Sequence, residues 1–278
     1  MLMNWLIKYL GGNKLNSKRD GHVHSHYCPH GSNDSFEEYL TKAIELGIEE
    51  ITFTEHMTMP EGLVLYGIDK EFLSSAAPNI EEMKKYLKEA SYYKEKYKDK
   101  IKINVGLEVD YLEGYEEFTT NMLNEYGKYL DDAIISVHIG MYDEKYYAFD
   151  CIESFEELLN KLGSVEKIYN LYYNTLLKGI KSNLGNYKPK RIGHPTLIRI
   201  FNKLYPINYK NDKLFEEIIN EVKLRNYELD CNTAGLRKQY CGEKYPSGDL
   251  YDLAIKNNIQ MVYGSDSHEA KDVGFNFK

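Results

Sequence analysis

The stretch Asp20–His30 contains four of the eight histidines of the chain, and these four fall within the nine positions from His22 to His30. In a β-strand alternate side chains share one face, so His22 and His24 would point in the same direction. Two neutral imidazoles on one face at a strand end can bind a metal ion. A polar loop that is merely rich in histidine would show the same residues, and the stretch alone leaves both interpretations open.

Strand and helix patterns alternate along the rest of the chain. We expect strands at residues 20–24, 50–54, 101–109, 132–138, 191–194, 227–232 and 260–264. Helical patterns lie between them, and Ser35 with Glu38 forms a capping box at the start of the first. A long loop, 57–77, follows the second strand, and loops of this length tend to serve binding or catalysis. The alternation predicts an α/β fold of parallel strands with right-handed crossovers.

Residues that can bind metal end six of the seven predicted strands, and the sixth strand ends in Asn232. They are His22, His24, His30, His56, Glu108, His138, His194, Asp266 and His268. In a closed parallel barrel the carboxyl ends of the strands meet at one face, where barrel enzymes place their sites, whereas an open sheet would spread them along a crevice. A single loop histidine is more often just hydrogen-bonded. The full set therefore favours a barrel with a metal site.

Composition limits the remaining possibilities. The chain has 278 residues, 28% of them charged, and a net charge of −8, which is typical of a globular protein and argues against a general nucleic-acid or membrane-surface binder. Its four cysteines form no CxxC pair, and the apolar run at residues 1–10 is too short to cross a bilayer, so we predict reduced thiols in the cytoplasm. We expect one domain over residues 20–278, preceded by an extension at 1–19.

Six short motifs, in this order, resemble those of the PHP (polymerase and histidinol phosphatase) family. They are Asp20-Gly21-His22-Val23-His24, Thr54-Glu55-His56, Gly106-Leu107-Glu108, Ser136-Val137-His138, Gly193-His194 and Gly264-Ser265-Asp266-Ser267-His268. The stretches Cys28–Ser32 and Asn232–Lys238 resemble the monofunctional histidinol-phosphate phosphatases of that family. The similarity covers about residues 19–275. The extension before Asp20 and an early end at Lys278 depart from the pattern, and we expect less cover over the last strand.

The resemblance implies a distorted seven-stranded TIM-like barrel, the PHP fold, with three divalent ions of zinc, iron or manganese. The first would be held by His22, His24, Glu108 and Asp266. Glu108 would bridge to the second, held also by His138 and His194, and the third would be held by His30, His56 and His268. Glu55, Asp20 and Asp110 are candidates to orient ligand histidines. His26 and Cys28 could also contact a metal ion, but the nine assigned residues already complete the pattern, so we expect both to be ordinary loop residues.

The implied activity is hydrolysis of L-histidinol phosphate to L-histidinol and phosphate, a step of histidine biosynthesis. Three divalent ions would exceed the two ligand carboxylates by four positive charges, which suits a phosphate dianion and an attacking metal-bridging hydroxide. Arg199 and Arg237 are candidates for phosphate binding, since a guanidinium matches phosphate geometry. Asp266 or a site histidine such as His268 would protonate the leaving alkoxide.

The sequence leaves three points open: the substrate pocket, the alternative functions, and the metal and oligomeric state. Glu61, Tyr66, Asp69 and Asp143 are candidates for a pocket that binds the amine and imidazole of the substrate. The alternatives are another PHP phosphoesterase, acting on a nucleotide, a sugar phosphate or phosphotyrosine, and a non-catalytic metal-binding barrel. Neither the metal identity nor the oligomeric state follows from the sequence.

Overall fold

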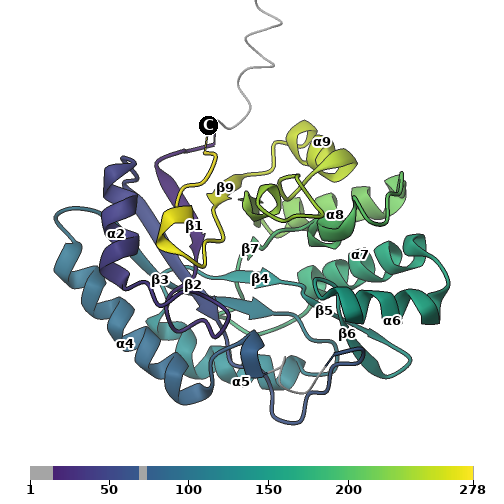
Figure 1. The fold of residues 1–278 in the computed structure, drawn as a ribbon, viewed down its shortest axis with the longest axis horizontal. Helices are drawn as coiled ribbons and strands as arrows, with labels where there is room; N and C mark the ends of the chain where they lie inside the picture. The colour runs from purple at the N-terminus through teal and green to yellow at the C-terminus, as the bar shows by residue number, and fades with distance from the viewer. Residues whose placement is uncertain (1–14, 69–73, 278) are drawn as a thin grey trace, which may run out of the picture.

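Seven parallel strands form a nearly closed barrel in the computed structural model, which describes residues 15–68 and 74–277 (Figure 1). The strands lie side by side in the order β1-β2-β3-β4-β7-β8-β9. Their bounds are Arg19–Val23 (β1), Glu50–His56 (β2), Lys102–Asp110 (β3), Ile134–Ser136 (β4), Arg191–Ile192 (β7), Glu228–Asn232 (β8) and Met261–Gly264 (β9). The predicted distorted seven-stranded barrel is confirmed.

Helices surround the barrel on its outer side (Figure 1). They are Phe36–Glu45 (α2), Ile80–Tyr97 (α4), Glu116–Tyr126 (α5), Ile152–Leu162 (α6), Val165–Lys181 (α7), Asp212–Leu224 (α8) and Gly248–Lys256 (α9), with short 3₁₀ turns at Gly127–Tyr129, Leu197–Phe201, Ala234–Leu236 and Ala270–Asp272. Ser35 caps α2 through the predicted capping box, and Asn79 caps α4 with Glu82 in the same way. None of the helices in the described ranges combines the length and the apolar composition that a bilayer crossing needs.

The barrel closes between β1 and β9 through a few backbone contacts rather than a full ladder. The His24 amide donates to the Ser267 carbonyl at 3.0 Å, and the Asp266 amide donates to the His22 carbonyl at 2.7 Å. The buried carboxylate of Asp20 accepts the Ser265 amide at 2.9 Å. This seam places the histidines of β1 directly beside the loop that follows β9.

One continuous hydrophobic core lies between the strands and the helices and runs from Val23 to Val273. Tyr86 of α4 is fully buried, and its hydroxyl donates to the carbonyls of Phe53 and Gly106, each at 2.8 Å. The ring of Phe277 stacks on Tyr263 of β9 at 4.5 Å between centroids, so the last described residue covers that strand. This packing leaves the carboxyl ends of the strands as the place for polar side chains.

The structure differs from the predicted elements in one region. The predicted strand at 132–138 is shorter, and an antiparallel hairpin follows it, with strands Ile139–Tyr142 (β5) and Lys145–Ala148 (β6). In its turn, Asp143 and Glu144 have φ values of 51° and 58°, which are left-handed. Aspartate and glutamate predict this conformation less strongly than glycine or asparagine do. Residues 1–14 of the predicted extension and Asp69 lie outside the described residues.

Candidate metal centre

The nine predicted ligands meet at the carboxyl face of the barrel, and the structure groups metal-capable donors there in three sets. Within each set the donor atoms lie within 4.8 Å of one another. The sets are His22, His24 and Asp266; Glu108, His138 and His194; and His24, Cys28, His56 and His268. His30 joins the third set, because its Nε2 lies 3.0 Å from His268 Nε2. His22 of β1 and His24, which directly follows the strand, point to the same side, as the alternation of side chains along an extended segment predicts.

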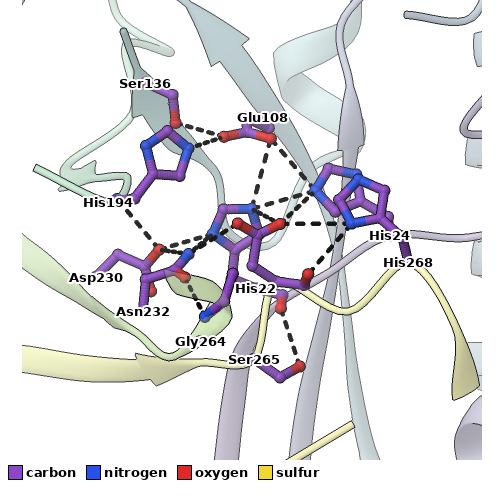
Figure 2. A network of polar contacts seen from close by, with 12 residues as sticks. His22, His24, Glu108, Ser136, His194, Asp230, Asn232, Gly264, Ser265 and His268 are labelled. Atoms are coloured by element: carbon purple, nitrogen blue, oxygen red, sulfur yellow. Dashed lines mark hydrogen bonds and ion pairs between the residues drawn. The ribbon is translucent and has the colours of Figure 1, made fainter. Parts of the chain in front are cut away.

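Glu108, at the end of β3, lies between the first two sets (Figure 2). Its Oε1 accepts from Ser136 Oγ at 2.6 Å and lies 2.9 Å from His194 Nε2. Its Oε2 faces His24 Nε2 at 3.3 Å and His22 Nε2 at 3.5 Å. Each oxygen therefore serves a different set, which is the arrangement of a carboxylate that bridges two cations.

Asp266 completes the first set from the loop after β9. Its Oδ1 lies 3.3 Å from His24 Nε2 and 3.6 Å from His22 Nε2, and its Oδ2 accepts from Asn232 Nδ2 at 3.1 Å. Asp266 has φ 51° and His194 has φ 23°, both outside the usual region for residues with a side chain. Strain of this kind concentrates at functional sites, where surrounding contacts hold the side chain in a fixed direction.

Carboxylates behind the ligand histidines fix their orientation. Asp110 Oδ1 lies 2.8 Å from His138 Nδ1, and Glu55 Oε1 lies 3.4 Å from His24 Nδ1, as the sequence suggested. Asp20 has a different role, because it binds the backbone amides of Ser265 and Gly274 at the barrel seam.

Asp230 was not predicted. Its Oδ2 lies 2.7 Å from His22 Nδ1, and both side chains are buried (Figure 2). Its place on β8, two residues before Asn232 and on the same face, was the available signal.

The protonation states suit metal ligands. Burial alone would raise the pKa of Glu108 and Asp266, but the surrounding imidazoles outweigh it and hold both values well below the usual range. Burial lowers the pKa of His56 and His268 well below that of a free histidine, so both are neutral. Burial also disfavours charge on His22, yet the carboxylates of Asp266 and Glu108 prevail and raise its pKa to about 10. The cluster thus favours positive charge at its centre.

Unpaired buried atoms also fit bound cations. Within the described residues, neither ring nitrogen of His56 makes a hydrogen bond, although the side chain is buried and Nδ1 lies 3.2 Å from Glu108 Oε2. Buried polar atoms normally have partners, and a metal ion supplies one to a neutral imidazole. Imidazole and carboxylate donors together suit zinc, iron or manganese. The residues present therefore fit the ions that the sequence implies.

A cavity of about 440 Å³ opens above the donor sets and is lined by members of all three. Arg237 lines it from the segment after β8. Its Nη2 donates to the Ser265 carbonyl at 2.8 Å, and its Nε lies 3.1 Å from Asp272 Oδ2. Its Nη1 is buried and makes no hydrogen bond within the described residues. Arg237 thus adds a firmly held positive charge to the wall of the cavity, which favours an anion there.

The other candidates lie elsewhere. The guanidinium of Arg199 forms two hydrogen bonds to Glu243, at 2.6 and 2.8 Å, and Arg199 is not among the residues that line the cavity. Glu61, Tyr66 and Asp143 are exposed, and they do not line it either. The acidic lining away from the ligands comes instead from Asp150, Glu269 and Asp272. His26 lies outside the donor sets, as expected, but Cys28 lies within one.

A parallel barrel with this cluster at its carboxyl face defines the class: a protein with a multinuclear metal site of histidines and carboxylates. The sequence matches the family model described as "PHP domain" over residues 20–234, and the chain belongs to that family.

The chain is also similar to individual proteins that are named histidinol phosphatases. The histidinol-phosphatase of Bacillus subtilis (strain 168) is 40% identical over 264 residues, 94% of this chain and 97% of the relative. A crystal structure of "the putative histidinol phosphatase hisK" from Listeria monocytogenes has a TM-score of 0.87 and 36% identity, and the match covers 93% of this chain and 98% of that one. Histidinol phosphate phosphatase from Lactococcus lactis, solved with zinc, L-histidinol and phosphate, shares the fold at 24% identity and a TM-score of 0.67, with 92% and 88% of the two chains covered.

Proposed function

We propose that this protein is a metal-dependent histidinol-phosphatase, which hydrolyses L-histidinol phosphate to L-histidinol and phosphate. The convergence of three donor sets on one cavity, which Arg237 also lines, carries the proposal. The family and the 40% identical histidinol-phosphatase support the substrate. When bound, divalent ions would activate a water molecule for in-line attack and polarise the phosphoryl oxygens.

The side chains of this protein have three tasks in that reaction. His22, His24, Glu108 and Asp266 would hold the first ion, Glu108 with His138 and His194 the second, and His30, His56 and His268 the third. Arg237 binds the phosphoryl group, while Asp272 and the Ser265 carbonyl keep its guanidinium in place. Asp266 or His268, which both line the cavity, would take up the proton that the attacking water releases and pass it to the leaving alkoxide.

The rest of the substrate needs a negatively charged partner. Asp150 lines the cavity, and within the described residues its carboxylate forms no salt bridge. The nearby lining includes the apolar side chains of Leu197 and Ile200, which suit the faces of an imidazole ring. We assign the substrate amine or imidazolium to Asp150.

The proposal extends to the setting of the enzyme. Residues 20–278 form one domain preceded by the extension 1–19, and the main hydrophobic core, which draws on residues from Val23 to Val273, supports this. The protein acts in the cytoplasm on a small phosphomonoester, without a nucleic-acid or membrane partner. The net charge of −8 and four free cysteines support this setting.

Steady-state kinetics over a panel of phosphomonoesters tests the substrate. The panel holds histidinol phosphate, a nucleotide, a sugar phosphate, phosphotyrosine and an aryl phosphate, each with zinc-, iron- and manganese-loaded protein. We expect the highest kcat/KM for histidinol phosphate, and loss of activity on chelation. Equal kcat/KM values across the panel would show that histidinol phosphate is not the specific substrate. Metal-loaded protein that is inactive on every ester would indicate a non-catalytic barrel.

A further inference from the structure

Cys28 lies inside the third donor set, although no role has been given to it above. Its side chain is only 3% exposed, and its Sγ lies 3.4 Å from His30 Nε2. The same sulfur lies within 4.8 Å of donor atoms of His56 and His268. The other three cysteines, Cys151, Cys231 and Cys241, are also buried, but none belongs to a donor set within the described ranges.

The spacing of these donors is that of ligands around one ion. Bond lengths of about 2.0–2.1 Å for zinc to nitrogen and about 2.3 Å for zinc to sulfur place tetrahedral ligands roughly 3.3 Å apart for two nitrogens and roughly 3.6 Å apart for nitrogen and sulfur. The observed separations are 3.0 Å between His30 Nε2 and His268 Nε2, and 3.4 Å between His30 Nε2 and Cys28 Sγ. A single ion can therefore reach both imidazoles and the sulfur.

The loop after β1 holds the sulfur in this place. The Cys28 amide donates to the Ser25 carbonyl, and the Gly31 amide donates to the Cys28 carbonyl, both at 3.0 Å. The Ser32 amide then donates to the His268 carbonyl at 2.8 Å, which ties the loop to the segment after β9. These contacts present Cys28 and His30 toward His268 from one short, constrained segment.

A second observation points to a ligand at the same spot. His56 is 6% exposed and belongs to the same donor set as Cys28, yet neither of its ring nitrogens has a hydrogen bond within the described residues. A buried imidazole without partners next to a buried thiol is costly unless something binds both. The Cys28 sulfur also lies within 4.8 Å of a donor nitrogen of His24, which gives the competing interpretation that the sulfur only orients His24.

We propose that Cys28 is a ligand of the third metal ion, alongside His30, His56 and His268. This inference rests on the metal dependence proposed above and adds a sulfur donor to a set otherwise made of imidazoles. A soft thiolate favours zinc or ferrous iron over manganese or magnesium. The third position is therefore selective for the softer ions, whereas the first two, built from imidazoles and carboxylates, accept the harder ones.

Cobalt substitution of the full-length protein tests this directly. Apoprotein is titrated with Co²⁺, because a thiolate bound to cobalt gives an intense near-ultraviolet charge-transfer band and imidazole or carboxylate ligands do not. We expect the band in wild-type protein to grow with one of the cobalt equivalents. Cys28→Ser should lack the band, and Cys151→Ser, a buried cysteine outside the donor sets, should keep it at full strength.

Metal analysis provides a second readout. We expect Cys28→Ser to bind zinc at one position about 10-fold or more weakly in chelator competition, with manganese affected less. If Cys28→Ser does not fold, X-ray absorption of the zinc-loaded wild type decides, since a zinc–sulfur shell near 2.3 Å is expected.

A fully metal-loaded wild type without the band or the sulfur shell would overturn the proposal, and so would a band that persists in Cys28→Ser. Phosphatase assays on the same samples distinguish a wrong role for Cys28 from a wrong proposed function. An active enzyme without metal–sulfur bonding would refute only the role of Cys28.

Discussion

Asp230 Oδ2 lies 2.7 Å from His22 Nδ1 in a contact between two buried side chains that joins β8 to β1. The same oxygen accepts from the His194 amide at 3.3 Å and from Asn232 Nδ2 at 3.0 Å. A carboxylate on Nδ1 keeps a proton there, so Nε2 is the nitrogen that would give up its proton and bind a cation beside Glu108 and Asp266. Gly264 is part of this arrangement, because a Cβ at that position would lie 2.2 Å from Asp230 Oδ1.

Asp230→Asn should weaken metal binding without removing any ligand. The amide can donate to His22 Nδ1, which would move the ring proton to Nε2 and block the ligating nitrogen. Loss of such an outer partner typically costs about 10- to 100-fold in metal affinity, and we expect a similar loss in activity. Chelator competition and elemental analysis measure the affinity.

Two variants check the Asp230 prediction. Asp230→Glu keeps the acceptor and should recover part of the metal affinity, whereas Glu228→Gln, at the other end of β8, should bind metal like the wild type. If Asp230→Asn retains full metal content and affinity with normal stability, the carboxylate does not orient His22.

The fold class and the positions of the nine candidate ligands could be predicted from the sequence because both follow local patterns and short, ordered motifs. The alternation of strands and helices predicted only a parallel α/β fold. Metal-capable residues such as His22, His56 and Glu108 at the same ends of the strands then favoured a barrel, because parallel strand ends meet at one face there. The hairpin β5–β6 escaped prediction because its turn uses Asp143 and Glu144 in a left-handed conformation rather than glycine or asparagine.

Pairing between distant residues could not be predicted in the same way. Both Arg199 and Arg237 were candidates for phosphate binding, and Arg237 was favoured only because it lies in the motif Asn232–Lys238. In the structure Glu243, 44 residues from Arg199, pairs with Arg199, whereas Arg237 lines the cavity. Cys28 was predicted to be a loop residue because the nine assigned ligands already completed the pattern, and nothing nearby in sequence shows that the loop folds back onto His268. Both outcomes depend on tertiary contacts that leave no local pattern.

The two arginines should respond differently to substitution by lysine. Arg237→Lys removes a fixed donor from the cavity, and a hydrogen bond to a charged group is worth about 1.5–3 kcal/mol, so kcat/KM should fall about 10- to 100-fold for every phosphomonoester. Arg199→Lys should change kcat/KM less than about 3-fold and instead lower stability through the loss of its paired bonds to Glu243. Kinetics with thermal unfolding measures both; a larger kinetic effect at Arg199 would reverse the assignment.

Asp150→Asn should change substrate selectivity rather than the phosphoryl chemistry. The variant loses the charge that faces the cationic part of histidinol phosphate, so we expect kcat/KM for that substrate to fall about 10-fold or more. An aryl phosphate has no cationic group, and its kcat/KM should stay within about 3-fold of the wild type. Glu61→Gln, on the exposed loop, should leave both values unchanged. Equal losses for both substrates at position 150 would show that Asp150 supports the metal site instead.

Lys188→Met should destabilise the protein without touching the metal centre. The Lys188 ammonium donates to the carbonyls of Gly179, Ile180 and Ser182 at 2.8, 2.8 and 2.7 Å, and so satisfies acceptors at the C-terminal end of α7. Methionine keeps the length of the side chain but donates nothing, so we expect a loss of about 1–3 kcal/mol in the free energy of unfolding. Lys190→Met, at an exposed position two residues on, is the matched control and should lie within about 0.5 kcal/mol of the wild type. Denaturant unfolding of the metal-loaded proteins measures both, and equal stability of the two variants would show that water replaces the ammonium at no cost.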